Sequence, residues 1–314
     1  MPLGIVPTVD YAFKRLFGDP NHSSVLLHLL NSVLAGEFVV EQVQIVTPFL
    51  ERDFQDDRLA ILDLRIRDAQ GRQYNLEMQT TAVESLPSRL LYYLSSMYSE
   101  QLAEGDSWEQ LTPAISVCFL DCEFLDQTQD FHTRFQVCSL QEQLVLTDQF
   151  ELHLVELPKF RGTASDMTQA SPLEKWAFFF QHAAELNATD FESVFRDEAF
   201  VEAGRILEMI SKTPEERLRY ELRLKVLRDQ QSNLEFAERR GREQGLEQGL
   251  EQGIEQGITR GREQGRELGY WIGRIRLLQE LLGDPDASVE ELEQQPLEQL
   301  ALIARKLEQR FKRR

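Results

Sequence analysis

The chain has 314 residues, of which 42% are hydrophobic and 9% aromatic, enough to form the core of one large domain or two ordinary ones. Its formal net charge of −19 argues against a protein that coats nucleic acid by bulk electrostatics. No apolar run approaches the roughly 20 residues of a membrane span, and the N-terminus lacks the pattern of a signal peptide. With only three cysteines, these features predict a cytoplasmic protein without disulfides and without a membrane partner.

The first 160 residues mix helical and strand-like patterns. Apolar residues at helical spacing predict helices over 8–19 and 21–37, followed by a strand over 39–46. Strict alternation then predicts a hairpin within 61–79, with a turn at 68–71 where Gly71 can take a positive φ. A helix over 84–105, a buried strand over 113–121 and weaker strands near 132–138 and 151–156 complete an α/β fold, a mixed sheet flanked by helices.

The remainder of the chain is helical by pattern. Residues 161–235 look wholly helical, and residues 236–314 hold a regular repeat followed by short helices. We therefore expect three parts: an α/β domain over 1–160, a helical region over 161–235 and a helical tail over 236–314.

The predicted hairpin places Asp63 across the ladder from Glu77, where facing Cβ atoms are about 4.5–5.5 Å apart. Like charges at such positions destabilise a sheet unless water, an arginine or a cation offsets the repulsion. Polar residues on one strand face are usually the solvated side of an antiparallel sheet. However, the apolar neighbours of both acids, and the order acid, turn, Glu-x-Gln and long helix, favour a Mg²⁺ site that substrate phosphate completes.

Four segments resemble a known family in the same order: DYAFKRLFG (10–18), LLNSVL (29–34), the hairpin (61–79) and RLLYYLSSMYSEQL (89–102). The family is that of the recombination-promoting nucleases and related transposases, a branch of the PD-(D/E)xK nuclease superfamily. The glycine-punctuated tail is also similar to many of its members. The resemblance implies a restriction-endonuclease-like fold and a DNA endonuclease, dependent on Mg²⁺ or Mn²⁺, that promotes DNA recombination or transposition.

The resemblance also implies roles for individual residues. Asp63 matches the first metal-binding acid and Glu77 the second, and the backbone carbonyl of Met78 is a further expected metal ligand. Gln79 stands where most of the superfamily has a catalytic lysine. Glutamine can hydrogen-bond a water but carries no charge and is no base at neutral pH. Lys14, on the opening helix, is the candidate for the missing positive charge.

Three further residues are accessory candidates. Asp10 lies one helical turn before Lys14, and Arg89 and Tyr93 lie four residues apart on the long helix that follows the hairpin, so each pair shares a helix face. The alternative interpretation of Lys14 is an ordinary solvent-exposed helix lysine.

Other site types have weaker support. Cys118, Cys122, Cys138 and His132 lack the Cys-x2-Cys spacing of a zinc knuckle. No Gly-x-Gly-x-x-Gly follows a strand and no Walker-type lysine occurs, so we expect no nucleotide cofactor. The rival function is a catalytically inactive protein that binds nucleic acid or oligomerises while retaining the nuclease fold.

The tail carries glycine at every fourth position from Gly241 to Gly273. Four aliphatic residues follow the same period: Leu246, Leu250, Ile254 and Ile258. Four residues advance a helix by about 400°, so this stripe differs from the 3.5-residue period of a left-handed coiled coil. Each glycine costs about 1 kcal/mol relative to alanine. Two interpretations stay open: a poorly ordered spacer, or a helix that packs closely against a second copy and makes a homo-oligomer.

The last ten residues, RKLEQRFKRR, hold six cations and one acid. In an acidic chain, this asymmetry fits either contact with DNA phosphates or neutralisation of a helix C-terminus.

Overall fold

The computed structural model describes residues 2–34, 36, 38–46, 64–81, 83–285 and 287–313. The chain divides into two compact units, residues 1–228 and residues 229–314. The domain boundaries expected at residues 160 and 235 stay a prediction.

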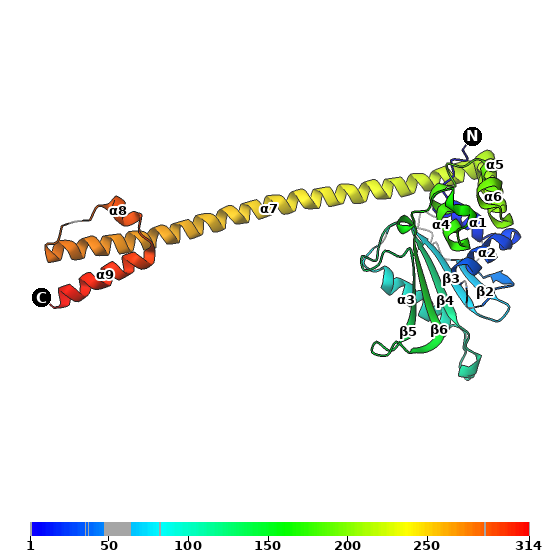
Figure 1. Cartoon of the computed structure of the whole chain (residues 1–314), viewed down its shortest axis with the longest axis horizontal. Helices are drawn as coiled ribbons and strands as arrows, with labels where there is room; N and C mark the ends of the chain where they lie inside the picture. The colour runs from blue at the N-terminus through cyan, green and yellow to red at the C-terminus, as the bar shows by residue number, and fades with distance from the viewer. Residues whose placement is uncertain are drawn as a thin grey trace. The chain divides into compact units, whose positions relative to one another are not determined.

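A mixed sheet of six strands, in the order β1-β2-β3-β4-β6-β5, lies at the centre of the first unit as far as it is described (Figure 1). The strands are β1 (Val43–Ile45), β2 (Leu64–Asp68), β3 (Gln73–Gln79), β4 (Ala114–Leu120), β5 (His132–Cys138) and β6 (Val145–Glu156). Strands β3, β4 and β6 run parallel, and the other neighbours pair antiparallel. The predicted mixed sheet is confirmed.

The β2–β3 hairpin is closed by Asp68. Its carboxylate accepts hydrogen bonds from the backbone N–H of Gln70 and of Arg72, both at 2.9 Å, and from the Tyr74 hydroxyl at 2.8 Å. Gly71 takes φ +85°, the left-handed region that the turn requires. The Asp68 side chain and Gly71 together fix the register of β2 against β3.

Helices cover one face of this sheet, which we call the core face. They are α1 (Asp10–Phe17), α2 (Ser23–Val33), α4 (Pro172–His182), α5 (Ala188–Phe195) and α6 (Glu198–Lys212). Their apolar sides form a single core with alternate strand residues such as Leu76, Met78 and Phe119. It also contains many aromatic rings in contact, such as Trp176 and Phe200, whose ring centroids are 4.3 Å apart.

Helix α3 (Leu86–Ser99) covers the opposite face, which we call the α3 face. Its buried residues Leu86 and Leu90 pack with the side chains of Cys118 and Leu154. The described residues of the first unit also form the 3-10 helices η1 (Pro20–His22), η3 (Trp108–Gln110), η4 (Leu157–Lys159) and η5 (Asp166–Thr168).

Helix α7 (Pro214–Leu282) begins in the first unit, where its first turns are attached to α1. Glu216 accepts a hydrogen bond from the Tyr11 hydroxyl at 2.7 Å and pairs with Arg15. The Tyr220 hydroxyl accepts a hydrogen bond from the backbone N–H of Val6 at 2.9 Å. The glycine repeat lies within this helix.

In the second unit, the end of α7 packs with α8 (Val289–Glu293) and α9 (Leu297–Lys312). The small core between them is aliphatic and contains Ile272, Ile275, Leu278, Leu292, Leu300, Ala304 and Leu307. Among the described helices, none has a stretch with the length and hydropathy of a membrane span.

Candidate active site

Glu77 lies on the α3 face of β3 and is fully buried. The side-chain amide of Asn75 donates to its Oε1 at 2.7 Å, and that of Gln79 donates to its Oε2 at 3.2 Å. Nη2 of Arg89, from the first turns of α3, lies 4.0 Å from the same Oε2. A carboxylate buried in an apolar layer costs free energy unless it is hydrogen-bonded or paired. These neighbours therefore reduce the free-energy cost of burying the Glu77 carboxylate.

Strand alternation explains why these side chains meet. Asn75, Glu77 and Gln79 occupy alternate positions of β3 and so share the α3 face, while the residues between them point into the core. The connection from β3 to α3, residues 80–85, is short, so α3 passes back over the same face of the sheet. Arg89, in the first turns of α3, therefore comes close to Glu77. The Glu-x-Gln motif of β3 and Arg89 of α3 thus form one polar cluster.

Asp63 lies outside the described residues, so its place opposite Glu77 stays a prediction. The described part of the hairpin has the register on which that prediction depends. Leu64 pairs with Leu76, and Arg65 pairs with Asn75.

Gln79 ends β3 and is partly exposed, and its backbone carbonyl accepts a hydrogen bond from the backbone N–H of Asp121 at 2.8 Å. Met78 is fully buried with its side chain in the core. Its predicted contribution is through the backbone carbonyl, and that role stays a prediction.

The two α1 candidates lie in a different environment. Asp10 is 3% exposed, and its carboxylate accepts a hydrogen bond from Arg223 of α7 at 2.6 Å and another from the backbone N–H of Tyr11 at 2.8 Å. Lys14 is 6% exposed. This burial excludes the interpretation of Lys14 as an ordinary solvent-exposed lysine. The contacts of Asp10 tie α1 to α7, a structural role that the sequence did not indicate.

On α3, Tyr93 lies one turn after Arg89 and is partly buried. The two residues share a helix side, as their spacing predicted. Arg89 is therefore the accessory candidate that the structure places beside Glu77, at 4.0 Å.

Sequence reasoning missed a second cluster of titratable groups, on the core face of β5 and β6. His153 and Glu151 are each 2% exposed. His153 Nδ1 lies 2.9 Å from His132 Nε2, and its Nε2 lies 2.8 Å from Glu151 Oε1, an ion-pair distance. Arg134 pairs with the same carboxylate. The antiparallel register, in which Arg134 faces His153, brings the group together. Pairing the two predicted strands as a hairpin is the signal that would have found it.

These neighbours shift the pKa values of the cluster. Burial, followed by the charge of His153, lowers the pKa of His132 to about 4, although Glu151 acts in the opposite direction. Burial raises the pKa of Glu151, but the hydrogen bonds and charges of His153 and Arg134 outweigh it, so this pKa is lowered overall. The cluster and Glu77 lie on opposite faces of the sheet, so the cluster is not part of the Glu77 site.

None of the three cysteines, all of which lie in the described ranges, forms a disulfide: Cys118 is buried, Cys122 is partly buried and Cys138 is exposed. Within the described ranges, no group of three or more histidine, cysteine, aspartate and glutamate side chains is arranged to hold a metal ion.

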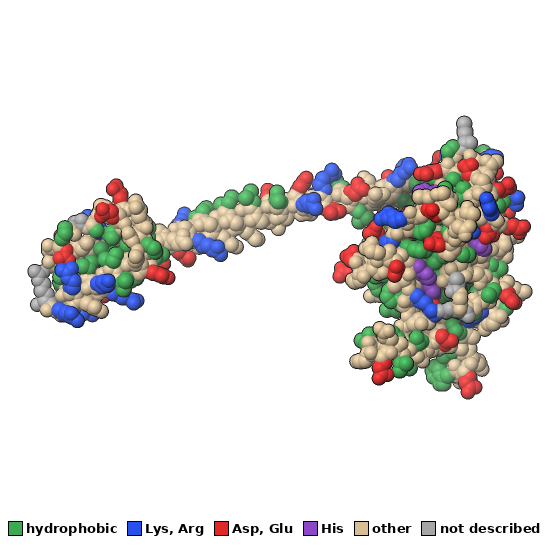
Figure 2. Space-filling model, in the orientation of Figure 1, with side chains coloured by type: hydrophobic (Ala, Val, Ile, Leu, Met, Phe, Trp, Pro, Cys, Tyr) green, Lys and Arg blue, Asp and Glu red, His purple; other side chains and the backbone are tan. Residues whose placement is uncertain are grey.

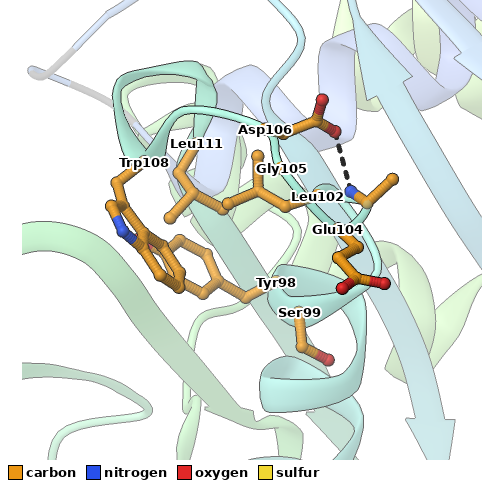
Figure 3. Close-up of a pocket in the computed structure, with 9 residues that line it drawn as sticks. Tyr98, Ser99, Leu102, Glu104, Gly105, Asp106, Trp108 and Leu111 are labelled. Carbon is orange, nitrogen blue, oxygen red and sulfur yellow. Dashed lines mark hydrogen bonds between the residues drawn. The ribbon is translucent and has the colours of Figure 1, made fainter.

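A cavity of about 520 Å³ lies at the other end of α3 (Figure 3). Its lining includes Tyr98, Leu102, Trp108 and Leu111, and Trp108 is 80% exposed. Arg89 is in the first turns of α3, whereas Tyr98 is in its last, so the cavity and the Glu77 cluster lie at opposite ends of the helix. The cavity contains none of the predicted site residues.

No curated protein and no solved structure matches the chain. A family model described as PD-(D/E)XK nuclease family transposase matches residues 7–237. The match includes the whole described sheet, the Glu77 cluster and helices α1 to α6. Because it covers well over half of the sequence, the chain belongs to the family of PD-(D/E)XK nuclease transposases.

Proposed function

We propose that the protein is a metal-dependent DNA endonuclease, which hydrolyses phosphodiester bonds and promotes DNA recombination or transposition. The observation that carries the proposal is the polar cluster of buried Glu77 and Asn75 with partly exposed Gln79 and Arg89, in a chain of this nuclease family. A polar cluster of this kind in an otherwise apolar layer is typical of a functional site.

The available donors fit a divalent cation. Asp63, Glu77 and the Met78 carbonyl offer hard oxygen ligands, which Mg²⁺ prefers and Mn²⁺ accepts. Mg²⁺ is often held by only one or two carboxylates, with waters and substrate phosphate as its other ligands. The amides that hold both oxygens of Glu77 would orient the carboxylate toward such an ion. A bound divalent cation supplies an activated water and charge neutralisation on the phosphate.

The protein residues divide the remaining work. Gln79 hydrogen-bonds the attacking water and orients it, in the place where the superfamily has lysine. Arg89 supplies the positive charge that Gln79 lacks. The Arg89 side chain is 36% exposed, and its Nε has no hydrogen-bond partner in the described part of the chain, so the guanidinium can turn toward a phosphate oxygen and donate to it. Lys14 stays the second candidate for this charge, with Asp10 and Tyr93 as accessory residues.

The location and assembly of the protein belong to the same proposal. Its three cysteines, which form no disulfide in the described part of the chain, fit a reducing, cytoplasmic environment. Copies of the chain would associate through the glycine repeat of α7, where the four aliphatic residues are exposed: Leu246 77%, Leu250 66%, Ile254 55% and Ile258 51%. Around each glycine from Gly241 to Gly273 the space is open, so a second helix backbone can approach closely.

Cleavage of supercoiled plasmid tests the nuclease proposal. The wild-type protein should nick plasmid with Mg²⁺ or Mn²⁺ and not with EDTA. Asp63→Asn and Glu77→Gln should each reduce the rate by at least about 100-fold, because each removes a charged ligand of the cation. Glu84→Gln, an exposed acid between β3 and α3, is the matched control and should cut at the wild-type rate.

The same assay decides between the two functions. A Glu77→Gln protein that remains folded by circular dichroism and cuts as fast as wild type would show that the site is misassigned. A wild-type protein that binds DNA but never cuts it with any divalent cation supports the catalytically inactive alternative.

A further inference from the structure

The charge of the chain is divided unequally between its two units. Residues 1–228 contain 36 acidic and 20 basic residues, whereas residues 229–314 contain 17 acidic and 14 basic residues. Duplex DNA carries one negative charge per about 1.7 Å of its axis. If the first unit cuts DNA as proposed above, its own net charge opposes the approach of the substrate. An attractive surface elsewhere in the chain would offset this repulsion.

Helix α9 carries such a surface. Four exposed cations lie on its solvent side, and we call them the α9 basic face: Arg305, Lys306, Lys312 and Arg313. At about 100° per residue they fall within about 120° of arc, opposite the buried Leu300, Ala304 and Leu307. Figure 2 shows Lys and Arg side chains gathered along this helix.

The fold of the second unit does not use these cations. Arg310 of α9 pairs with Asp284 at 2.6 Å, and Glu308 accepts a hydrogen bond from Arg274 of α7 at 2.6 Å. Those contacts attach α9 to the rest of the unit. The four residues of the α9 basic face form no ion pair with any described residue. Glu308 is the acid between Lys306 and Arg313 in the sequence. It lies outside the arc of these cations and is turned toward Arg274.

We propose that the α9 basic face binds the phosphate backbone of duplex DNA, independently of sequence, and so recruits substrate to the chain. From Arg305 to Arg313, the helix rises about 12 Å. An equal length of duplex axis carries about seven charges. Gln309 lies between the cations on the same arc and adds a hydrogen-bond donor for phosphate oxygens. The competing partner is an acidic protein surface, such as the first unit of another copy.

The test measures binding of the full-length chain to a fluorescent duplex of about 30 base pairs, in EDTA so that no cleavage occurs. Salt is varied from about 50 to 200 mM, because log K falls with log salt in proportion to the phosphates neutralised. The variant with Arg305→Gln, Lys306→Gln, Lys312→Gln and Arg313→Gln should bind at least about tenfold more weakly at low salt. Its slope should be smaller by about 3 to 4.

A matched variant removes four exposed cations from the first unit: Arg161→Gln, Arg196→Gln, Arg205→Gln and Lys212→Gln. It has the same net charge as the α9 variant and should keep the wild-type slope. An α9 variant with wild-type affinity and slope overturns the proposal. An unchanged DNA affinity, combined with a lower mass by light scattering, overturns it in favour of a protein partner.

This test fails or succeeds separately from the nuclease proposal. A chain that binds DNA through α9 but does not cut plasmid with Mg²⁺ keeps the α9 basic face and loses the nuclease assignment. If the wild-type chain cuts plasmid and its α9 variant binds DNA as well as wild type, the nuclease assignment is kept and the α9 basic face is lost.

Discussion

Two cations compete for the role that lysine plays in most of the superfamily. Arg89 reaches to within 4.0 Å of a Glu77 oxygen, and its Nε has no hydrogen-bond partner among the described residues. Lys14 is 6% exposed on α1. A cation near the scissile phosphate stabilises the charge that develops in the transition state. The geometry therefore favours Arg89 as the residue that offsets the neutral Gln79.

If Arg89 has this role, its substitution should slow plasmid nicking. Arg89→Gln should lower kcat for plasmid nicking by about 100-fold, the magnitude typical of one lost transition-state donor, with little change in KM. Arg89→Lys should recover part of the rate because it restores the charge but not the planar fork. Arg67→Gln, an exposed arginine on β2, is the matched control. If Lys14→Gln abolishes cleavage in a folded protein while Arg89→Gln does not, Lys14 has the role.

Among the elements, most strands and helices follow from local pattern. The alternation in 61–79 and the apolar run after Pro113 predict β2, β3 and β4 because each pattern records which side chains are buried. Boundaries that depend on distant pairing were less accurate. Strand β6 begins at Val145, ahead of the expected 151, because its first residues pair with β5. The helix expected to reach 105 ends at Ser99.

The sequence predicts the candidate site only in part. Glu77 and Gln79 share a strand face by alternation alone, which the sequence contains directly. The contact of Glu77 with Arg89 depends on how α3 folds back over β3, and spacing along the chain does not record that. The cluster of His132, His153 and Glu151 was missed for the same reason, since it exists only through the β5–β6 pairing.

The paired strands β5 and β6 make stability depend on pH. In the unfolded chain His132 takes up a proton near pH 6.5, whereas in the folded protein it does so only near pH 4. Between these values the unfolded state binds more protons, so the free energy of unfolding falls as the pH falls. The melting temperature of the wild-type protein should therefore decrease from about pH 7 to about pH 5.

A substitution isolates this contribution. His132→Gln should show a smaller decrease in melting temperature over the same range, because it removes the group that binds the extra proton. His182→Gln, at a partly exposed histidine of α4, is the control and should follow the wild-type profile. Equal slopes for wild type and His132→Gln would mean that His132 is not the group responsible.

At the scale of the whole molecule, α7 continues from the first unit into the second unit without a break at the repeat. Glycine weakens a helix but does not end it as proline does. Nine glycines would together cost several kcal/mol if the helix were isolated. Burial of an aliphatic side chain contributes about 1.5–3 kcal/mol. Packing Leu246, Leu250, Ile254 and Ile258 against a second copy would offset much of this cost.

Copies of the chain should therefore associate through the repeat. Light scattering should give the wild-type chain a mass that is a multiple of 36.5 kDa, with the repeat amides protected from hydrogen exchange. Replacing all four aliphatic residues by serine should return the mass to that of one chain and remove the protection. Leu277→Ser with Leu281→Ser, two exposed leucines at the end of the same helix, is the matched control and should leave the mass unchanged. A wild-type chain with the mass of a single copy and unprotected repeat amides would mean that the repeat is a spacer. In that case each chain would approach DNA with a single nuclease unit, and the repeat would contribute reach rather than affinity.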